Sequence, residues 1–556
     1  MLRSGRLGKL SVSAFDPERI LTRGRDDGEQ RVTLAMVRRS GGEGSILVSE
    51  KVIMRLGALL LAVSSTAASA QAVISQPAGT YAVGLRVVQQ YDHSREFKGA
   101  VDPVTGQTVS GERSRPIQTL IWYPASRGGA PLRYRDYAAT RLTEADFDLT
   151  GSRLKELAAD QAAGIAADLG DEAPAALDAP MLASRDAPMA SGKFPVVIYA
   201  PGAGGAADEN ADLAEYLAGN GYVVIASTNM GARGKQNDYS PKGAEPQIAD
   251  IEFLLGYAQS LPDADMAHVA VMGWSWGGMN NVLAAVRDSR IGALISLDGT
   301  REPPITKQID VRRLTAPWLY MSRIPSTIPQ LNRNEVDTSF SLLNAAKYAD
   351  VYQLTMFPMR HADFTSRMQR ESDASAYGEY SKTEVRHTYN VAALYIRNFL
   401  DAYLKYEKNG LAFLRRSPLQ NGAAPHTILA ETHQAEAAPA SQEQLAVKLA
   451  RDGFGHAIEA YQTTHQQDPS FALSEEELKA WGYALMEQKR PADASAIFKL
   501  WTILHSQDWN AFDSLGEAYE AAGDRRASIE SYRRSLALNA GNTNAAKHLK
   551  ALGEAR

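Results

Sequence analysis

Short runs of consecutive apolar residues recur through the middle of the chain, with helical patterns between them. The runs are rich in β-branched residues and flanked by Gly, Pro or Asn, which is typical of buried strands. They cover residues 194–200, 222–227, 268–272, 291–297 and 317–321. Helical segments lie around residues 211–218, 247–260 and 278–286. This alternation predicts an α/β fold with a mostly parallel sheet, helices on both faces, and ligands at the carboxyl ends of the strands.

Two further elements are predicted before this alternation begins. Apolar runs at residues 80–88 and 117–123 predict a pair of early strands joined by a polar, glycine-containing loop. Residues 150–168 then follow a helical pattern and lead into a stretch rich in Ala, Pro and Asp. We expect a helical cap at about residues 140–190, inserted into a catalytic domain that spans residues 71–411.

The C-terminal part of the chain has a different character. Residues 412–443 are rich in Ala, Pro and Gln without a sustained period, which predicts a linker. Within residues 444–556, a 34-residue offset aligns Gly482 with Gly516 and Phe498 with Tyr532. This spacing resembles the tetratricopeptide repeat and predicts an all-α region that holds a protein partner. An ordinary helical bundle is the alternative.

The N-terminus carries the pattern of a secretory signal. Residues 54–70 contain one positive charge, a short apolar stretch and the run Ala68-Ser69-Ala70, which matches the A-x-A cleavage pattern. Residues 1–53 are polar and rich in arginine, so either translation begins at Met54 or an extension precedes the signal. A buried helix over the apolar stretch is the alternative. We expect a periplasmic or secreted protein without a transmembrane anchor.

The amino-acid composition limits the partners and the nucleophiles that the chain can have. The chain of 556 residues has 44% hydrophobic and 22% charged residues and a formal net charge of −5, so it is globular and lacks the basic surface that nucleic acid requires. It has no cysteine, which excludes disulfides, thiolate metal sites and a Cys nucleophile. A nucleophile in this chain must be Ser, Thr, Asp or Lys. We expect neither a metal nor a cofactor.

A G-x-S-x-G motif lies between one of the predicted strands and the helical segment that follows it. It consists of Gly273, Ser275 and Gly277, with Trp274 and Trp276 at the variable positions. This setting is that of a nucleophile elbow, in which the turn around the Ser is strained and the helix passes close to the strand, where side chains would collide. Ser275 is therefore the predicted nucleophile.

A Ser nucleophile needs a His to take its proton and a carboxylate to orient that His. Asp298 follows the predicted strand after the elbow helix, 23 residues beyond the Ser, and is the predicted acid. Glu335 and Asp337 are the alternatives. His361 lies in a loop just after the predicted last strand, residues 351–356, and is the predicted base, whereas His387 opens a helix and is the alternative.

The negative charge that develops on an attacked carbonyl oxygen needs two N–H donors. Trp276, directly after the Ser, is predicted to supply one of them. The loop after the strand at residues 194–200 reads PGAGG, and its Ala203 is predicted to supply the other, with Gly202 and Gly204 shaping the turn. Phosphate binding is the alternative use of such a loop, but the loop lacks the G-K-[ST] ending.

Taken together, these motifs resemble a known family. The segments APGAGG, GWSWGG, LDG and HADF occur in the order found in platelet-activating-factor acetylhydrolase-like and dienelactone-hydrolase-like α/β-hydrolases, over about residues 80–405. The resemblance implies a calcium-independent serine esterase that acts on small or lipid-like acyl esters, often short-chain ones. In two respects the chain differs: Pro201 stands where the acetylhydrolases commonly have His, and the dienelactone enzymes use a Cys nucleophile.

Two other functions stay open at this point. The chain could be a binding protein in which the helical repeats act and the hydrolase fold is a non-catalytic platform. It could also be a serine amidase or peptidase, because the same triad cleaves amides when the leaving nitrogen is protonated. The complete set of Ser, His, Asp and N–H donors favours the serine ester hydrolase.

Overall fold

A computed structural model describes most of the chain beyond residue 71. The described residues are 72–97, 114–232, 234, 238–299, 304–326, 329–330, 339–373 and 377–554. The predictions for the polar extension at residues 1–53 and the signal peptide at residues 54–70 fall outside these ranges.

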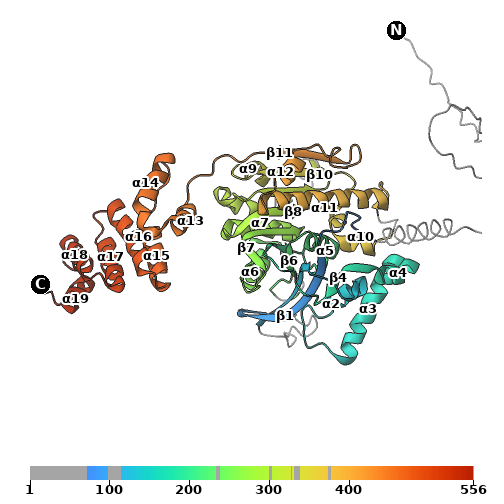
Figure 1. The fold of residues 1–556 in the computed structure, drawn as a ribbon, viewed down its shortest axis with the longest axis horizontal. Coiled ribbons are helices and arrows are strands. Elements are labelled where there is room, and N and C mark those ends of the chain that lie inside the picture. The colour runs from blue at the N-terminus through green and yellow to red at the C-terminus, as the bar shows by residue number, and fades with distance from the viewer. Residues whose placement is uncertain are drawn as a thin grey trace, which may run out of the picture. The chain divides into compact units, whose positions relative to one another are not determined.

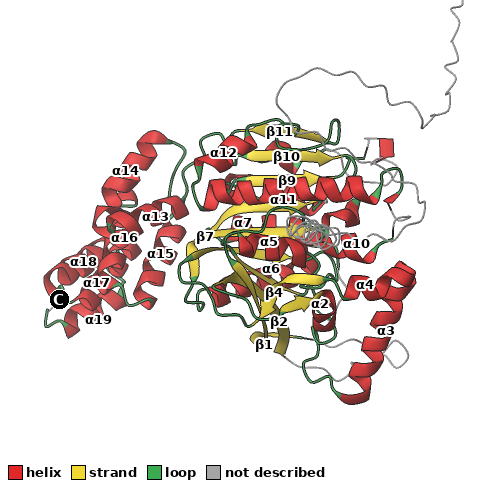
Figure 2. Ribbon diagram, turned by 45° about the vertical axis from the view of Figure 1, so that its right-hand side comes forward, coloured by secondary structure: helices red, strands yellow, loops and turns green. Residues whose placement is uncertain are grey.

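Within the described residues, eleven strands form one sheet, drawn in yellow in Figure 2, in the order β11-β10-β9-β8-β7-β5-β6-β2-β1-β4-β3. The six neighbours from β6 through β5, β7, β8 and β9 to β10 are all parallel. The strand bounds are β1 Ala82–Glu96, β2 Ser114–Ala125, β3 Pro131–Arg133, β4 Pro180–Arg185, β5 Phe194–Ala200, β6 Val223–Ser227, β7 Ala264–Trp274, β8 Ile291–Leu297, β9 Trp318–Ser322, β10 Val351–Met356 and β11 Ile428–His433. The predicted, mostly parallel sheet is confirmed.

Helices cover both faces of this sheet, because its central strands are apolar on both sides. Every residue of β5 is buried. One core cluster joins the sheet to helices α5 and α11, and a second joins its other face to α6 and α7. The helices of this part of the chain are α2 Tyr134–Thr140, α3 Gly151–Leu169, α4 Ala173–Leu177, α5 Ala211–Gly219, α6 Pro241–Ala258, α7 Trp276–Arg287, α9 Leu342–Ala345, α10 Ser366–Glu371, α11 Lys382–Leu404 and α12 Lys408–Leu414.

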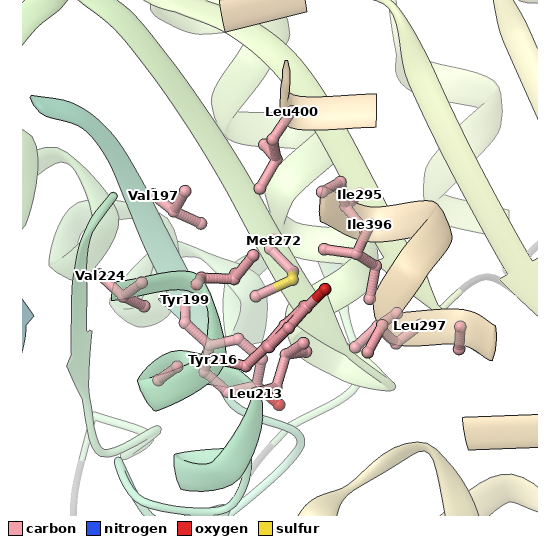
Figure 3. Packing of buried hydrophobic residues seen from close by; sticks show 14 of the residues in the cluster. Val197, Tyr199, Leu213, Tyr216, Val224, Met272, Ile295, Leu297, Ile396 and Leu400 are labelled. Atoms are coloured by element: carbon pink, nitrogen blue, oxygen red, sulfur yellow. The ribbon is translucent and has the colours of Figure 1, made fainter. Parts of the chain in front are cut away.

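The first of these clusters shows how the helices fix the sheet (Figure 3). Met272 and Ile295, from neighbouring parallel strands, lie beside Ile396 of α11, and Tyr216 of α5 closes the same layer. Met272, Ile295 and Ile396 are at most 2% exposed. Burying an apolar side chain of this size contributes about 1.5–3 kcal/mol to folding. The packing therefore makes a rigid support for the loops at the strand ends.

The early strands form as predicted, but the predicted cap extends too far. β1 and β2 pair antiparallel, in the register Leu85 to Trp122. The helices α3 and α4 lie inside the predicted cap at about residues 140–190, whereas β4, inside the same range, pairs parallel with β1 in the main sheet. β4 is only six residues long, and its apolar run ends at Ala183 within a stretch rich in Ala, Pro and Asp, so the sequence does not mark it as a strand.

The predicted linker at residues 412–443 also needs a correction. Its residues 428–433 form strand β11, which pairs antiparallel with β10 and lies at the edge of the sheet. Five of its six residues are exposed, and its apolar run is only three residues long, residues 428–430, so the sequence gives a weak strand signal. The sheet therefore extends beyond residue 411, where the catalytic domain was predicted to end.

The C-terminal helices, coloured orange to red in Figure 1, form pairs that repeat along the chain. Helices α15 and α17 begin 34 residues apart, and so do α16 and α18. A methyl group on Gly482 would meet the Phe498 ring at 2.1 Å, and one on Gly516 would meet the Tyr532 ring at 2.6 Å, so each glycine admits the ring of the next helix. The bounds are α13 Gln442–Asp452, α14 Ala457–Gln467, α15 Glu475–Glu487, α16 Pro491–Leu504, α17 Trp509–Ala522, α18 Arg525–Leu538 and α19 Thr543–Ala551.

No helix in the described part of the chain is long and apolar enough to cross a membrane.

A buried carboxyl group, Glu215 of α5, joins the sheet to the cap side of the domain. It accepts hydrogen bonds from the Tyr137 hydroxyl at 2.6 Å and from the main-chain N–H groups of Leu182 at 2.8 Å and Ala183 at 3.0 Å. Burial raises the pKa of Glu215 to about 7 and nearby Asp212 adds to this, while the hydrogen bonds lower the pKa.

We expect the free energy of unfolding to decrease as the pH rises from about 5 to 7. The folded chain keeps the Glu215 proton in this range, whereas the unfolded chain has released it, so a rising pH favours unfolding. Glu215→Gln should reduce the slope by up to about 1.4 kcal/mol per pH unit, measured by urea unfolding at several pH values. The matched change Glu156→Gln, on the exposed side of α3, should leave the slope unchanged. An unaltered slope in Glu215→Gln would contradict this assignment.

Candidate active site

Ser275 forms the sharp turn between β7 and α7. Its backbone has φ 54° and ψ −121°, a left-handed conformation that is strained for a residue with a side chain. Its main-chain N–H donates to the Leu297 carbonyl of the next strand at 3.0 Å, which holds the turn against the sheet. Trp276 is the first residue of α7, so its N–H has no partner within the helix. The predicted nucleophile and one predicted N–H donor therefore lie at the carboxyl edge of the sheet.

The glycines of the motif make this turn possible by leaving room for the main chain. A methyl group on Gly277 would come within 2.0 Å of the Ala200 carbonyl oxygen at the end of β5. One on Gly273 would come within 2.6 Å of the Gly277 main chain. Real side chains do not approach this closely, so α7 can pass β5 only because both positions lack a Cβ.

The structure brings the three residues of the predicted triad together. His361 Nε2 lies 2.8 Å from Ser275 Oγ, and His361 Nδ1 lies 2.5 Å from Asp298 Oδ2. Asp298 directly follows β8, and His361 follows β10 and opens a short 3₁₀ turn, His361–Phe364. The Asp298 side chain is buried, while the His361 side chain is about one third exposed. Their roles as acid and base stay predictions.

Asp298 is oriented by a residue that the sequence did not indicate. The main-chain N–H of Arg323, just after β9, donates to Asp298 Oδ1 at 3.2 Å. The Arg323 guanidinium lies beside the other oxygen, with Nε 3.3 Å from Oδ2. Asp298 has a positive φ of 49° and donates its own N–H to the Met321 carbonyl at 2.7 Å. These contacts leave the carboxylate facing the imidazole.

Trp274, the first variable position of the motif, supports the histidine loop. Its indole Nε1–H donates to the His361 main-chain carbonyl at 2.8 Å, and its ring lies 4.9 Å from the imidazole centroid, tilted by 34°. The strand before the nucleophile thus holds the residue predicted to activate it. This contact joins segments 87 residues apart, so no local sequence signal could have indicated it.

The loop after β5 lies against the nucleophile, as the motif predicted. A methyl group on Gly202 would come within 2.4 Å of the Trp274 ring and 3.4 Å of Ser275 Cβ. The loop then turns back, with Gly205 N–H donating to the Gly202 carbonyl at 2.9 Å and Gly204 at a φ of +65°. Ala203 lies within this turn and is half-buried. Its role as an N–H donor stays a prediction.

The alternative residues have different positions. His387 lies inside α11 and its Nε2 is 3.0 Å from the Gly422 carbonyl, so it contacts none of the three triad residues. The alternatives Glu335 and Asp337 fall outside the described residues. Across the described ranges, no group of three or more His, Asp or Glu side chains could hold a metal ion.

Two exposed apolar side chains belong to segments next to this site. Tyr239, just before α6, packs edge-on against the Trp276 ring at 5.2 Å and is 66% exposed. Ile324 follows the Arg323 that contacts the acid, and it is 53% exposed.

Comparisons with known proteins agree with this description. Residues 181–387 match the Dienelactone hydrolase family. Over 141 residues the chain is 33% identical to the "Putative carboxymethylenebutenolidase" of Synechocystis sp., a match that covers 21% of this chain and 57% of that protein. The chain thus spans little more than half of that relative's length. Among solved structures, a ferulic acid esterase from Streptomyces cinnamoneus matches with a TM-score of 0.45 and 20% identity, over 64% of this chain and 98% of that one.

The matched range 181–387 contains Ser275, Asp298 and His361 and most of the parallel strands. This part of the chain is thus similar to the Dienelactone hydrolase family, and its sheet and helices have the predicted α/β arrangement. The predicted fold class and the resemblance to dienelactone-hydrolase-like proteins are confirmed, whereas the resemblance to the acetylhydrolases stays a prediction. The tetratricopeptide character of the C-terminal helices stays a prediction.

We expect Gly277→Ala to destabilise the domain, because the new methyl group would overlap the Ala200 carbonyl. Overpacking of this kind costs about 1–3 kcal/mol, which thermal unfolding would detect as a lower melting temperature. Gly256→Ala is the matched control, since nothing lies within 4 Å of the added methyl group on α6. A melting temperature for Gly277→Ala as high as that of Gly256→Ala would show that α7 passes β5 differently.

Proposed function

We propose that this protein is a serine hydrolase of carboxylic esters, with Ser275 as nucleophile, His361 as base and Asp298 as the group that orients the base. The observation that carries the proposal is the continuous hydrogen-bonded chain from Ser275 Oγ through both imidazole nitrogens to the buried Asp298 carboxylate. A hydroxyl, an imidazole and a carboxylate in this order are the parts that activate a serine.

With this geometry the reaction would have two halves, acylation of Ser275 and hydrolysis of the acyl-enzyme by water. Ser275 Oγ attacks the ester carbonyl carbon as its proton passes to His361 Nε2, and the carbonyl π electrons move onto the oxygen. The main-chain N–H groups of Ala203 and Trp276 would stabilise that oxyanion. When the tetrahedral intermediate collapses, the alcohol leaves with the proton from His361 and the acyl group stays on Ser275. Water then repeats the sequence and releases the carboxylic acid.

Ester substrates are supported by the family and by the relative's name. The matched family is that of dienelactone hydrolases, and a carboxymethylenebutenolidase acts on a lactone, which is an internal ester. The family resemblance is to enzymes with a Cys nucleophile, and this chain has no cysteine. We therefore propose ester hydrolysis through an oxygen nucleophile rather than the dienelactone reaction itself.

The border of the site supports small or lipid-like substrates without charge near the bond that breaks. Tyr239 packs against the Trp276 ring and is exposed, so it could offer apolar contact to an acyl or alcohol group. Burial of each CH₂ of a substrate against such surface contributes about 0.8 kcal/mol. Substrates with short acyl chains and apolar leaving groups are the proposed class.

Export and partner binding are further proposals. The signal-like pattern at residues 54–70 supports a periplasmic or secreted enzyme. The 34-residue offset of the C-terminal helix pairs supports tetratricopeptide-like repeats, which would bind a protein partner and leave the ester chemistry to the sheet.

Substitutions in the triad test the proposed function directly. Ser275→Ala should abolish turnover of p-nitrophenyl acetate, because it removes the attacking oxygen. Asp298→Asn should lower kcat by about 10⁴, because an amide favours the wrong imidazole tautomer. His361→Ala should be as inactive as Ser275→Ala, since the effects of residues that act as a unit do not add.

His387→Ala is the matched control, a histidine that lies away from the triad on α11. It should keep the wild-type kcat, and all four variants should keep the melting temperature within a few degrees. An active His361→Ala beside an inactive His387→Ala would refute the assignment of the base. Full activity of Ser275→Ala would refute the proposed function.

A further inference from the structure

Asn229 is a buried amide directly behind the loop that follows β5. It lies two residues after the end of β6 and is 1% exposed. Because β5 and β6 are parallel neighbours, the loops after them meet at the same edge of the sheet. None of the sequence motifs includes this residue, and the proposed chemistry has no step for it.

The Asn229 amide holds two carbonyl groups of the loop. Its Nδ2 donates to the Gly202 carbonyl at 2.8 Å and to the Pro201 carbonyl at 3.3 Å. Its main-chain N–H donates to the Gly205 carbonyl at 3.0 Å. Asn229 therefore holds the loop at both ends of its tight turn.

The orientation of this amide is fixed by its surroundings. Both groups that face Nδ2 are carbonyls, which only accept, so the opposite orientation would set oxygen against oxygen. Asn229 Oδ1 is buried and has no hydrogen-bond partner among the described residues. An unpaired buried acceptor destabilises the folded state, so Asn229 contributes through its Nδ2 donor and not through Oδ1.

Two other buried side chains hold the same loop. Gln247 of α6 donates from Nε2 to the Pro201 carbonyl at 2.8 Å, and Asn280 of α7 in turn donates to Gln247 at 2.6 Å. Glu209 accepts the Gly202 N–H at 3.0 Å. The Gly202 carbonyl also accepts the Gly205 N–H of the turn at 2.9 Å, and among these side chains only Asn229 adds a second hydrogen bond to it.

The Gly202 carbonyl belongs to the same peptide group as the Ala203 N–H. A trans peptide is planar, and its C=O and N–H point in opposite directions. When Asn229 holds the carbonyl towards β6, the Ala203 N–H must point away from β6. A methyl group on Gly202 would come within 3.4 Å of Ser275 Cβ, so this peptide group lies beside the nucleophile.

We infer that Asn229 is a positioning residue of the oxyanion hole: by holding the Gly202 carbonyl, it aims the Ala203 N–H at the oxygen of the substrate. This inference rests on the proposed ester hydrolysis. It adds to that proposal a residue that orients one of the oxyanion donors, the Ala203 N–H, before the substrate binds. A donor that is already oriented stabilises the transition state more than the bound substrate, so Asn229 acts on kcat and not on KM.

Asn229→Asp tests the inference, since it keeps the shape of the side chain and replaces the NH₂ donor by an acceptor. We expect kcat for p-nitrophenyl acetate to fall by about 10²-fold or more, the usual effect of losing one oxyanion donor, with KM nearly unchanged. Inhibition by phenylboronic acid, which forms a tetrahedral adduct on the serine, should weaken in parallel. Asn229→Ala also removes the donor but introduces no charge, and it should likewise lower kcat with KM nearly unchanged.

Asn390→Asp is the matched control. Asn390 lies on α11, is also buried, and its Nδ2 donates to the Val73 and Arg386 carbonyls at 2.8 Å each. Asn390→Asp should lose stability as Asn229→Asp does, because both variants lose a buried donor. Its kcat should stay within about threefold of the wild type, because Asn390 does not contact the oxyanion loop.

The results distinguish a failure of this inference from a failure of the proposed function. A wild-type kcat in either Asn229 variant, a rise in KM alone, or an equal loss of kcat in Asn390→Asp would overturn the positioning role while the proposed function stands. A wild-type protein that hydrolyses no ester would overturn the proposed function, and this inference with it.

Discussion

The strained turn at Ser275 is the constraint on which the rest of the site depends. A residue with a side chain at a φ of 54° costs about 1–3 kcal/mol, so the surrounding structure must hold it there. It is held by the hydrogen bond from the Ser275 N–H to the Leu297 carbonyl and by the close passage of α7 over β5 at Gly277. The turn brings Ser275 Oγ within 2.8 Å of His361 Nε2 and places it directly before the first N–H of α7.

The parallel sheet brings the other groups to this turn. The loops after β5, β8 and β10 end at the same edge, so Ala203, Asp298 and His361 surround Ser275 although they come from distant parts of the chain. Each of these loops is held by the protein behind it. Asn229 holds the loop after β5, Arg323 contacts Asp298, and Trp274 bonds the main chain of His361.

Much of this arrangement could be predicted from the sequence, because local patterns encode it. Buried β-branched runs marked the central strands, and the glycines of the motif marked the turn around Ser275. The edges of the sheet could not be predicted, since the apolar runs of β4 and β11 are short and β11 is mostly exposed. Asn229, Arg323 and Trp274 were missed as supporting residues for a different reason. Their roles arise from contacts between segments 25 to 87 residues apart, and an isolated Asn, Arg or Trp carries no pattern.

The central claim is that Ser275 forms a covalent acyl-enzyme, and trapping that intermediate tests it most directly. The protein would be mixed with p-nitrophenyl acetate, quenched in acid during turnover, digested and measured by mass spectrometry. The account predicts one acetyl group on the peptide that contains Ser275, and none on that peptide in Ser275→Ala. Turnover without any acylated peptide, or an acyl group that forms on another peptide and persists in Ser275→Ala, would contradict it.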